Sequence, residues 1–328
     1  MKTITKQILF LICILISALH LQSKNSILQE NKITTFENID SVASWSTNVK
    51  VNYVTINNSS IRYLTSGEGD PMILIHSVRT RSDFFQKLIP ELSKQYKIYA
   101  IDLPGHGGSD IPKGKYDEAF FRDYVSQFID ALQLKNTTIV GESIGATLAL
   151  TIAANDSLNN IKQVFAINPA DYKVGIKRSS LLARIVFTSC EIPGINLVAS
   201  NAENNLILKR IMRGGLYNKD AIPSDLFKLV AKTRKHKGFG RFFRAFSKHY
   251  SSWIKAREMY SNIKIPVTLI YGDHDWSHLE EREANKNIIK NSSLNTLKNT
   301  GHFASVDNPN EVLEIILDNK INTSLKTK

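Results

Sequence analysis

The chain has 328 residues, of which 42% are hydrophobic and 22% are charged, and its formal net charge is +12. This composition is typical of a globular protein and excludes a disordered, collagen-like or disulfide-dense chain. Its two cysteines, Cys13 and Cys190, are too few for a disulfide framework or a cysteine metal site.

The pattern of residues 1–23 predicts a signal peptide for export or an N-terminal membrane anchor. Lys2 and Lys6 precede an apolar run over residues 8–21. A basic start followed by an apolar run of this length is typical of a secretory signal peptide, and the run is short for a membrane span. Because no clean small-x-small cleavage motif follows, an uncleaved anchor is the alternative. Both place the folded domain outside the cytoplasm, after a hydrophilic linker of residues 24–49.

Eight segments have the composition of β-strands, and helical segments alternate with most of them. The strands are predicted at residues 51–56, 61–65, 72–76, 97–102, 137–140, 164–167, 267–271 and 294–297. The helices are predicted at residues 84–93, 116–132, 143–154, 280–289 and 310–318. This alternation is typical of βαβ units around a mostly parallel sheet. The predicted fold class is therefore α/β, with a doubly wound sheet.

The alternation stops after Pro169 and resumes at Pro266. Residues 171–262 are helical, basic and aromatic in character, and they contain 18 Lys and Arg residues against 6 Asp and Glu residues. This segment therefore carries the whole positive excess of the chain. We predict a core of residues 50–170 and 263–322, interrupted by a helical basic insertion of residues 171–262.

A candidate nucleophile lies in the sequence Gly-Glu-Ser-Ile-Gly at residues 141–145, which matches Gly-x-Ser-x-Gly. The motif lies between a predicted strand and a predicted helix. A sharp strand-to-helix turn exposes the hydroxyl of Ser143, and small flanking residues let the chain pass. The helix N-terminus supplies positive potential for a developing oxyanion. The alternative is a glycine-rich loop that only closes a βα unit.

A serine hydroxyl needs a base that takes its proton, and His302 is the best candidate. It follows Gly301 between the last predicted strand and the last predicted helix. The acid that orients this histidine is expected after a strand between the serine and the histidine. Asp273 and Asp275 both follow the strand at residues 267–271. We assign the role to Asp275, and we interpret Asp273 as a turn former.

These motifs together resemble the α/β-hydrolase superfamily, over roughly residues 50 to 320. The matching segments are residues 74–76, 102–109, 141–145, 272–275 and 301–302, and their order is more specific than any one of them. The resemblance implies a helical cap over the site and a catalytic triad of Ser143, His302 and Asp275. It also implies that segment 102–109 is mostly structural, with His106 as a turn residue.

The resemblance further implies two backbone N–H donors for an oxyanion, one of which is that of Ile144. The other comes from the loop after the third strand, which in the family usually reads His-Gly-x. This chain has His76-Ser77-Val78 there, so the donor by position is the Val78 N–H, to which Ser77 could contribute. Serine at the glycine position departs from the family pattern, and it could change the backbone conformation of this loop and with it the geometry of the second donor.

The predicted function is hydrolysis of a carboxylic ester, with lipid esters as one option, through an acyl-enzyme on Ser143. Alternatives of the same fold are hydrolysis of an amide, a lactone or a carbon–carbon bond. A non-catalytic ligand-binding or membrane-interaction protein is the alternative of a different class. Serine at the nucleophile position argues against dehalogenase-like and epoxide-hydrolase-like relatives, which use aspartate. The sequence contains neither a metal-ligand cluster nor a dinucleotide motif, so we predict no cofactor.

The insertion is expected to line the substrate pocket, and one stretch of it is aromatic and basic. Phe239, Phe242, Phe243 and Phe246 recur at near-helical spacing, with Arg241 and Arg244 among them. This stretch is either a patch that docks on anionic lipid headgroups or, as is more common, a helix that packs its aromatic side chains on the core. Basic charge could also attract an acidic small substrate. A nucleic-acid partner is not predicted, because no recognition motif accompanies the charge. The sequence leaves the oligomeric state open.

Overall fold

The computed structural model describes residues 45–46, 48–172, 178–179, 181–192, 194–200 and 204–326, without the side chains of residues 198–199 and 319–326. The predicted export segment and most of the predicted linker lie outside these residues. None of the described helices is long and apolar enough to cross a membrane.

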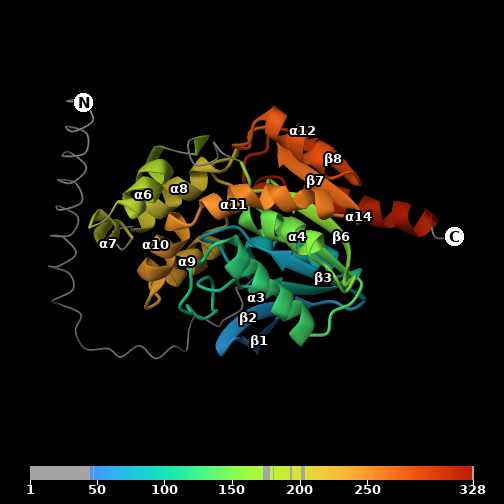
Figure 1. Cartoon of the computed structure of the whole chain (residues 1–328), viewed down its shortest axis with the longest axis horizontal. Coiled ribbons are helices and arrows are strands. Elements are labelled where there is room, and N and C mark those ends of the chain that lie inside the picture. Colours follow the sequence, from blue (N-terminus) through green and yellow to red (C-terminus); the bar gives the residue numbers. More distant parts are fainter. Residues whose placement is uncertain are drawn as a thin grey trace.

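An eight-stranded sheet forms the centre of the molecule, with the strand order β1-β2-β4-β3-β5-β6-β7-β8 (Figure 1). The strands are β1 (Lys50–Ile56), β2 (Ser59–Ser66), β3 (Asp70–Ile75), β4 (Tyr96–Ile101), β5 (Thr137–Glu142), β6 (Ile161–Ile167), β7 (Val267–Gly272) and β8 (Ser292–Leu297). Strand β2 is antiparallel to both β1 and β4, and the remaining pairs are parallel. The predicted mostly parallel α/β sheet is therefore confirmed.

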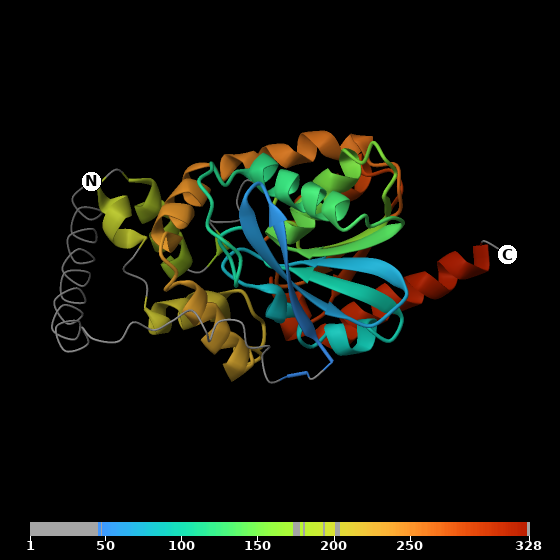
Figure 2. The ribbon, with the colours of Figure 1, turned by 90° about the horizontal axis from the view of Figure 1, so that it is seen from below.

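Helices cover both faces of this sheet, as Figure 2 shows. Alternate strand residues point to opposite faces, so Ile73 packs with the cluster that includes α3 (Glu118–Ala131) and α4 (Ile144–Ala154). Its neighbour Leu74 packs with the other cluster, which includes η1 (Ser82–Phe85), α2 (Ile89–Leu92), α13 (Ala304–Asp307) and α14 (Pro309–Lys326). The remaining core helix, α12 (Leu279–Ile288), connects β7 to β8. The central strands β3, β5 and β7 are therefore buried on both sides over most of their length, which is why apolar runs mark them in the sequence.

The helix predicted at residues 84–93 is wrong as one continuous element. The structure has η1 and α2 there, separated by a turn at residues 86–88. Pro90 lies at the start of α2. Because proline has no N–H and its ring clashes with the preceding turn of a helix, it begins helices rather than continuing them. The last helix, in contrast, continues beyond its predicted end.

Between β6 and β7, the regular elements of the described residues are all helices. They are α6 (Leu181–Glu191), α7 (Ile195–Ala199), α8 (Asn205–Gly214), α9 (Ser224–Thr233), α10 (Phe239–Lys248), α11 (Ser251–Lys255) and η2 (Ala256–Asn262). In both views α6, α7 and α8 lie at the end of the molecule opposite the end of α14 (Figures 1 and 2). The predicted helical insertion is thus present, and its helices lie beside the carboxyl ends of the parallel strands, where the candidate site is.

Candidate active site

Ser143 occupies the sharp turn between β5 and α4. Its backbone has φ 60° and ψ −118°, a conformation that non-glycine residues rarely adopt. A Cβ on Gly145 would lie 2.0 Å from the carbonyl oxygen of Ile75, and one on Gly141 would lie 2.1 Å from that of Gly145. Both positions therefore require glycine, and the spacing of the motif follows from the close approach of α4 to β3.

The structure brings together the three residues predicted as a triad, from loops that follow three different strands. The Oγ of Ser143 lies 2.9 Å from Nε2 of His302, and Nδ1 of His302 lies 2.6 Å from Oδ1 of Asp275. All three side chains are buried. Because a carboxylate can only accept, Nδ1 carries the proton and Nε2 is free to accept from the serine hydroxyl. This is the arrangement that general-base activation of a serine requires.

Asp275 is held as an ionised acceptor by further donors. The backbone N–H of Ser277 donates to Oδ2 over 2.9 Å, and the Ser277 hydroxyl donates to the same oxygen. Nε of Arg282 donates to that hydroxyl over 2.9 Å. Burial by itself raises the pKa of Asp275, but the hydrogen bonds from His302 and Ser277 outweigh it and hold the pKa below its usual value. Asp273, in contrast, accepts from the backbone N–H of Thr300 and forms part of the turn.

Two residues that the sequence analysis missed position His302. Asn168, directly after β6, donates through Nδ2 to the backbone carbonyls of Gly301 and His302 over 3.2 and 2.9 Å. Its Oδ1 accepts from the N–H of Gly272 over 3.0 Å, so it joins the loops that carry the acid and the base. The ring of Trp276 stacks on the imidazole, with centroids 4.0 Å apart and planes 15° from parallel. The sequence could have indicated Trp276 by its adjacency to Asp275, but it contains no comparable signal for Asn168.

The loop after β3 contains the second predicted oxyanion donor. The carbonyl of Ser77 accepts from the hydroxyl of Thr80 over 2.6 Å and from Nδ1 of His76 over 2.7 Å. The Leu103 N–H donates to Nε2 of the same imidazole over 3.0 Å, which leaves the proton on Nδ1. Since a trans peptide directs C=O and N–H to opposite sides, these bonds also fix the direction of the Val78 N–H.

Serine at position 77 does not force an unusual backbone, because the positive φ of this loop falls at Arg79, with 61°. Val78 lies at the pocket beside Ser143, and Ile144 begins α4 there. A first helical residue has no intrahelical acceptor for its N–H. The oxyanion roles of Val78 and Ile144 stay predictions.

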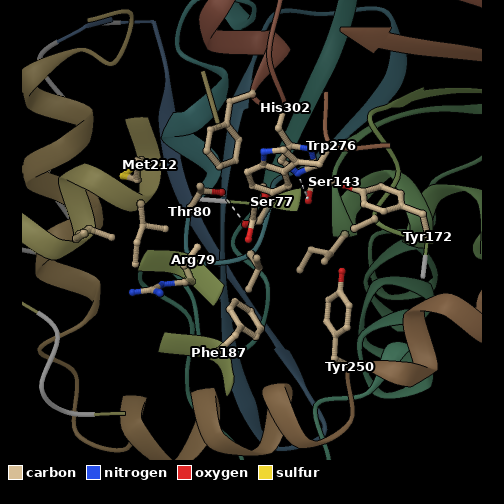
Figure 3. Close-up of a pocket in the computed structure, with 18 residues that line it drawn as sticks. Ser77, Arg79, Thr80, Ser143, Tyr172, Phe187, Met212, Tyr250, Trp276 and His302 are labelled. Carbon is tan, nitrogen blue, oxygen red and sulfur yellow. Dashed lines mark hydrogen bonds between the residues drawn. The ribbon is translucent and has the colours of Figure 1, made fainter. Parts of the chain in front are cut away.

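Ser143 and His302 open onto a pocket beneath the inserted helices, shown in Figure 3. Figure 3 shows Arg79 and Met212 on one side of Ser143, and Tyr172 and Tyr250 on the other. The pocket is lined by Ser77, Val78, Arg79, Thr80, Ser143, Ile144, Ala170, Tyr172, Ser179, Ala183, Phe187, Leu208, Ile211, Met212, Tyr250, Trp276, His302 and Phe303. These described lining residues include one arginine and no carboxylate, and most are apolar. The pocket therefore suits a largely apolar substrate.

The prediction that six cap residues line the substrate site is corrected by the structure, since none of them lines this pocket. Phe239, Phe242, Phe243 and Phe246 on α10 are buried, which agrees with the packing alternative rather than with a lipid-docking patch. The ring of Phe242, for example, packs against those of His106 and Tyr116. Arg241 donates to the carbonyl of Ile111 over 2.8 Å, and Arg244 donates to the hydroxyl of Ser200 over 2.7 Å. Helix α10 thus fastens the insertion to the core, and the inserted helices that line the pocket are α6 and α8.

The segment at residues 102–109 is structural in its contacts. Asp102 accepts from Arg62 over 2.9 Å and from the N–H of Gly108 over 2.8 Å. The N–H of His106 donates to the Leu103 carbonyl in a turn, and burial lowers the pKa of this histidine to about 3. His106 is not among the residues that line the pocket. Over the described ranges, no group of three or more His, Cys, Asp or Glu residues could hold a metal ion.

Comparisons with known proteins agree with this fold. Residues 70–189 match the family model described as alpha/beta hydrolase fold. The (E)-2-((N-methylformamido)methylene)succinate hydrolase of Acinetobacter baylyi is 22% identical over 257 residues, which cover 78% of this chain and 92% of that protein. The soluble epoxide hydrolase of Corynebacterium sp. is 22% identical over 282 residues, which cover 83% of this chain and 97% of that protein.

Among solved structures, a serine hydrolase involved in carbazole degradation superposes with a TM-score of 0.67 at 18% identity. The match covers 82% of this chain and 98% of that one. The sheet, the inserted helices and the family match over residues 70–189 lead to one conclusion: the chain has the α/β-hydrolase fold.

Proposed function

We propose that this protein is a serine hydrolase that cleaves a carboxylic ester. The observation that carries the proposal is the unbroken chain of hydrogen bonds from Ser143 through His302 to Asp275, with distances of 2.9 and 2.6 Å. It ends at an apolar pocket that can receive an acyl group. Serine at this position supports acyl transfer over epoxide or haloalkane chemistry, in which the family uses aspartate.

The reaction runs in two steps on the same residues. His302 takes the proton of Ser143 as the hydroxyl attacks the ester carbonyl, and the Ile144 and Val78 N–H groups stabilise the oxyanion. The imidazolium, stabilised by Asp275, then protonates the leaving alkoxide, and an acyl-enzyme remains on Ser143. Water activated by His302 attacks this acyl-enzyme and releases the carboxylic acid.

Amide hydrolysis is the second candidate. The curated relative from Acinetobacter baylyi is named for a formamido-substituted succinate, which contains an amide nitrogen. An amide would use the same nucleophile, but its leaving amine must be protonated by the His302 imidazolium before it departs. Paired esters and amides with the same acyl group separate the two candidates by their relative kcat/KM.

The test is hydrolysis of an acyl-ester series, from acetate to palmitate, by the full-length protein and its Ser143→Ala variant. We expect ester turnover that Ser143→Ala abolishes, and labelling of Ser143 by an alkyl phosphonate that mass spectrometry detects on its peptide. Ser261→Ala, which alters an exposed serine of η2, is the matched control and keeps full activity. Equal ester turnover by the wild type and by Ser143→Ala would rule the proposal out, and so would no turnover at all.

A further inference from the structure

The inserted helices leave large apolar side chains in solvent at one end of the molecule. Leu181 on α6, Leu197 on α7 and Leu206 on α8 are 69%, 59% and 59% exposed. Ile192, between α6 and α7, is also exposed. These helices lie together at the end opposite the C-terminal helix in both views (Figures 1 and 2). Because α6 is in contact with both α7 and α8, these exposed leucines are neighbours in the fold and form a candidate interaction surface.

Exposed basic residues accompany these leucines. Arg184 on α6 and Lys209 and Arg210 on α8 are exposed. One acidic residue, Glu191 at the end of α6, is also exposed there. We use the name cap face for Leu181, Arg184, Leu197, Leu206, Lys209 and Arg210. The face combines apolar side chains with positive charge, and it belongs to the segment that carries the whole +12 of the chain.

Two helices of the cap face, α6 and α8, also line the pocket. Ala183 and Phe187 line the pocket from α6, while Leu181 and Arg184 of the same helix face solvent. On α8, Leu208, Ile211 and Met212 line the pocket, while Leu206, Lys209 and Arg210 face solvent. Each helix therefore separates the space above Ser143 from the exterior by its own thickness, about 10 Å.

We infer that the cap face docks on an anionic lipid surface and that the substrate of Ser143 is an ester of a lipid drawn from that surface. Leucines enter the boundary between headgroups and acyl chains, and Arg and Lys side chains reach the anionic headgroups. Docking through α6 and α8 brings the apolar pocket next to the source of an apolar acyl group. The substrate part of this inference rests on the proposed ester hydrolysis, whereas the docking part does not.

The surface is different from the one that the sequence indicated. The aromatic side chains of α10 are buried, and they are unavailable for lipid in this structure. Charge complementarity favours an anionic bilayer as the occupant of the cap face, since each basic residue near such a surface contributes roughly 1 kcal/mol to binding. A second copy of this chain would place the basic residues of two cap faces near one another, which is unfavourable.

The first test reports on the face itself, so that any anchoring by the N-terminal segment does not mask the result. Single cysteines replace Leu197 or Leu206 in a full-length Cys13→Ser background, in which Cys190 is buried, and carry an environment-sensitive fluorophore. We expect a blue shift of emission on addition of phosphatidylcholine vesicles containing phosphatidylglycerol. Leu158→Cys and Leu279→Cys, on the core and 65% and 59% exposed, are the matched controls and should show no shift.

Three outcomes overturn the docking inference. They are no shift at positions 197 and 206, equal shifts at the two control positions, and a shift that appears with protein concentration in the absence of lipid. The last of these would identify a second copy of the chain as the occupant. An equal response to pure phosphatidylcholine vesicles would overturn the anionic part.

The second test measures the charge contribution. In the fluorophore-labelled protein, Lys209→Gln with Arg210→Gln should raise the lipid concentration at half-maximal shift by about fivefold for each neutralised residue. Lys286→Gln with Lys290→Gln changes the net charge equally on the exposed surface of the core and should leave that concentration unchanged. Equal effects of the two pairs would overturn the inference.

Hydrolysis provides the separate test of the substrate. Docking with Ser143-dependent release of fatty acid from the vesicles supports both proposals. Docking with Ser143-dependent turnover of soluble esters alone overturns only the lipid substrate. Docking without turnover of any ester overturns the proposed function and leaves the docking result intact.

Discussion

Replacement of Asp275 by asparagine tests the triad with the smallest change in shape. In the wild type both carboxylate oxygens accept, Oδ1 from His302 over 2.6 Å and Oδ2 from the Ser277 N–H over 2.9 Å. An asparagine must direct its NH2 at one of these partners. If the NH2 faces His302, Nδ1 must accept, the proton moves to Nε2, and the base can no longer take the serine proton. If the NH2 faces Ser277 instead, this NH2 and the backbone N–H of Ser277 are two buried donors that point at each other.

Neither orientation of asparagine satisfies the site, so no rotation rescues the variant. The wrong imidazole tautomer lowers kcat about ten-thousandfold in a serine-protease triad, which corresponds to about 5.4 kcal/mol of transition-state stabilisation. The burial of all three triad residues excludes bulk water as a substitute acceptor. We therefore expect kcat/KM of Asp275→Asn to fall by about a thousand- to ten-thousandfold.

The assay is kcat/KM on the preferred ester, with circular dichroism as the check of folding. Asp273→Asn is the matched control, because it makes the same chemical change two residues away in a side chain that accepts from Thr300 rather than from His302. Its kcat/KM should stay within about threefold of the wild type. A folded Asp275→Asn protein that keeps more than a tenth of the wild-type value would refute the assignment of Asp275 as the orienting acid.

Three further predictions concern residues around the site. Burial raises the pKa of Glu142 from 4.5 to about 8, so the native state holds a proton that the unfolded state releases, and this stability is lost as pH rises from about 4.5 to about 8. Glu142→Gln should remove this part of the pH dependence of the free energy of unfolding; a wild-type-minus-variant difference that is constant over this range would contradict the prediction. Gly145→Ala places a Cβ 2.0 Å from the carbonyl oxygen of Ile75 and should destabilise the fold by at least about 3 kcal/mol in urea unfolding, and a loss below about 1 kcal/mol would show that α4 can move away from β3. Asn168→Asp places a carboxylate oxygen against two carbonyls and should cost at least about 3 kcal/mol, whereas the same change at the exposed Asn291 should cost less than about 0.5 kcal/mol; equal losses would refute the role of Asn168 as a link between the two loops.

Local pattern determined much of this protein. Strands buried on both faces must be apolar along their whole length, so the runs at β3, β5 and β7 could be recognised without any knowledge of their neighbours. The triad could be predicted because its members occupy the turns that follow strands, in a fixed chain order. The match between Gly-x-Ser-x-Gly and the turn at Ser143 has a steric cause, since the two glycines are the only residues that fit beside Ile75 and Gly145.

Tertiary structure alone decided what surrounds the triad. A helical spacing of aromatic residues shows that α10 has an apolar face, but it does not say whether that face meets the pocket, the core or solvent. The packing of the insertion turned this face to the core and placed Phe187 and Met212 over Ser143 instead. Asn168 is equally invisible in the sequence, because its value lies in contacts with residues more than a hundred positions away. Which surface of a helix is buried depends on every element packed around it, and that information is distributed over the whole chain.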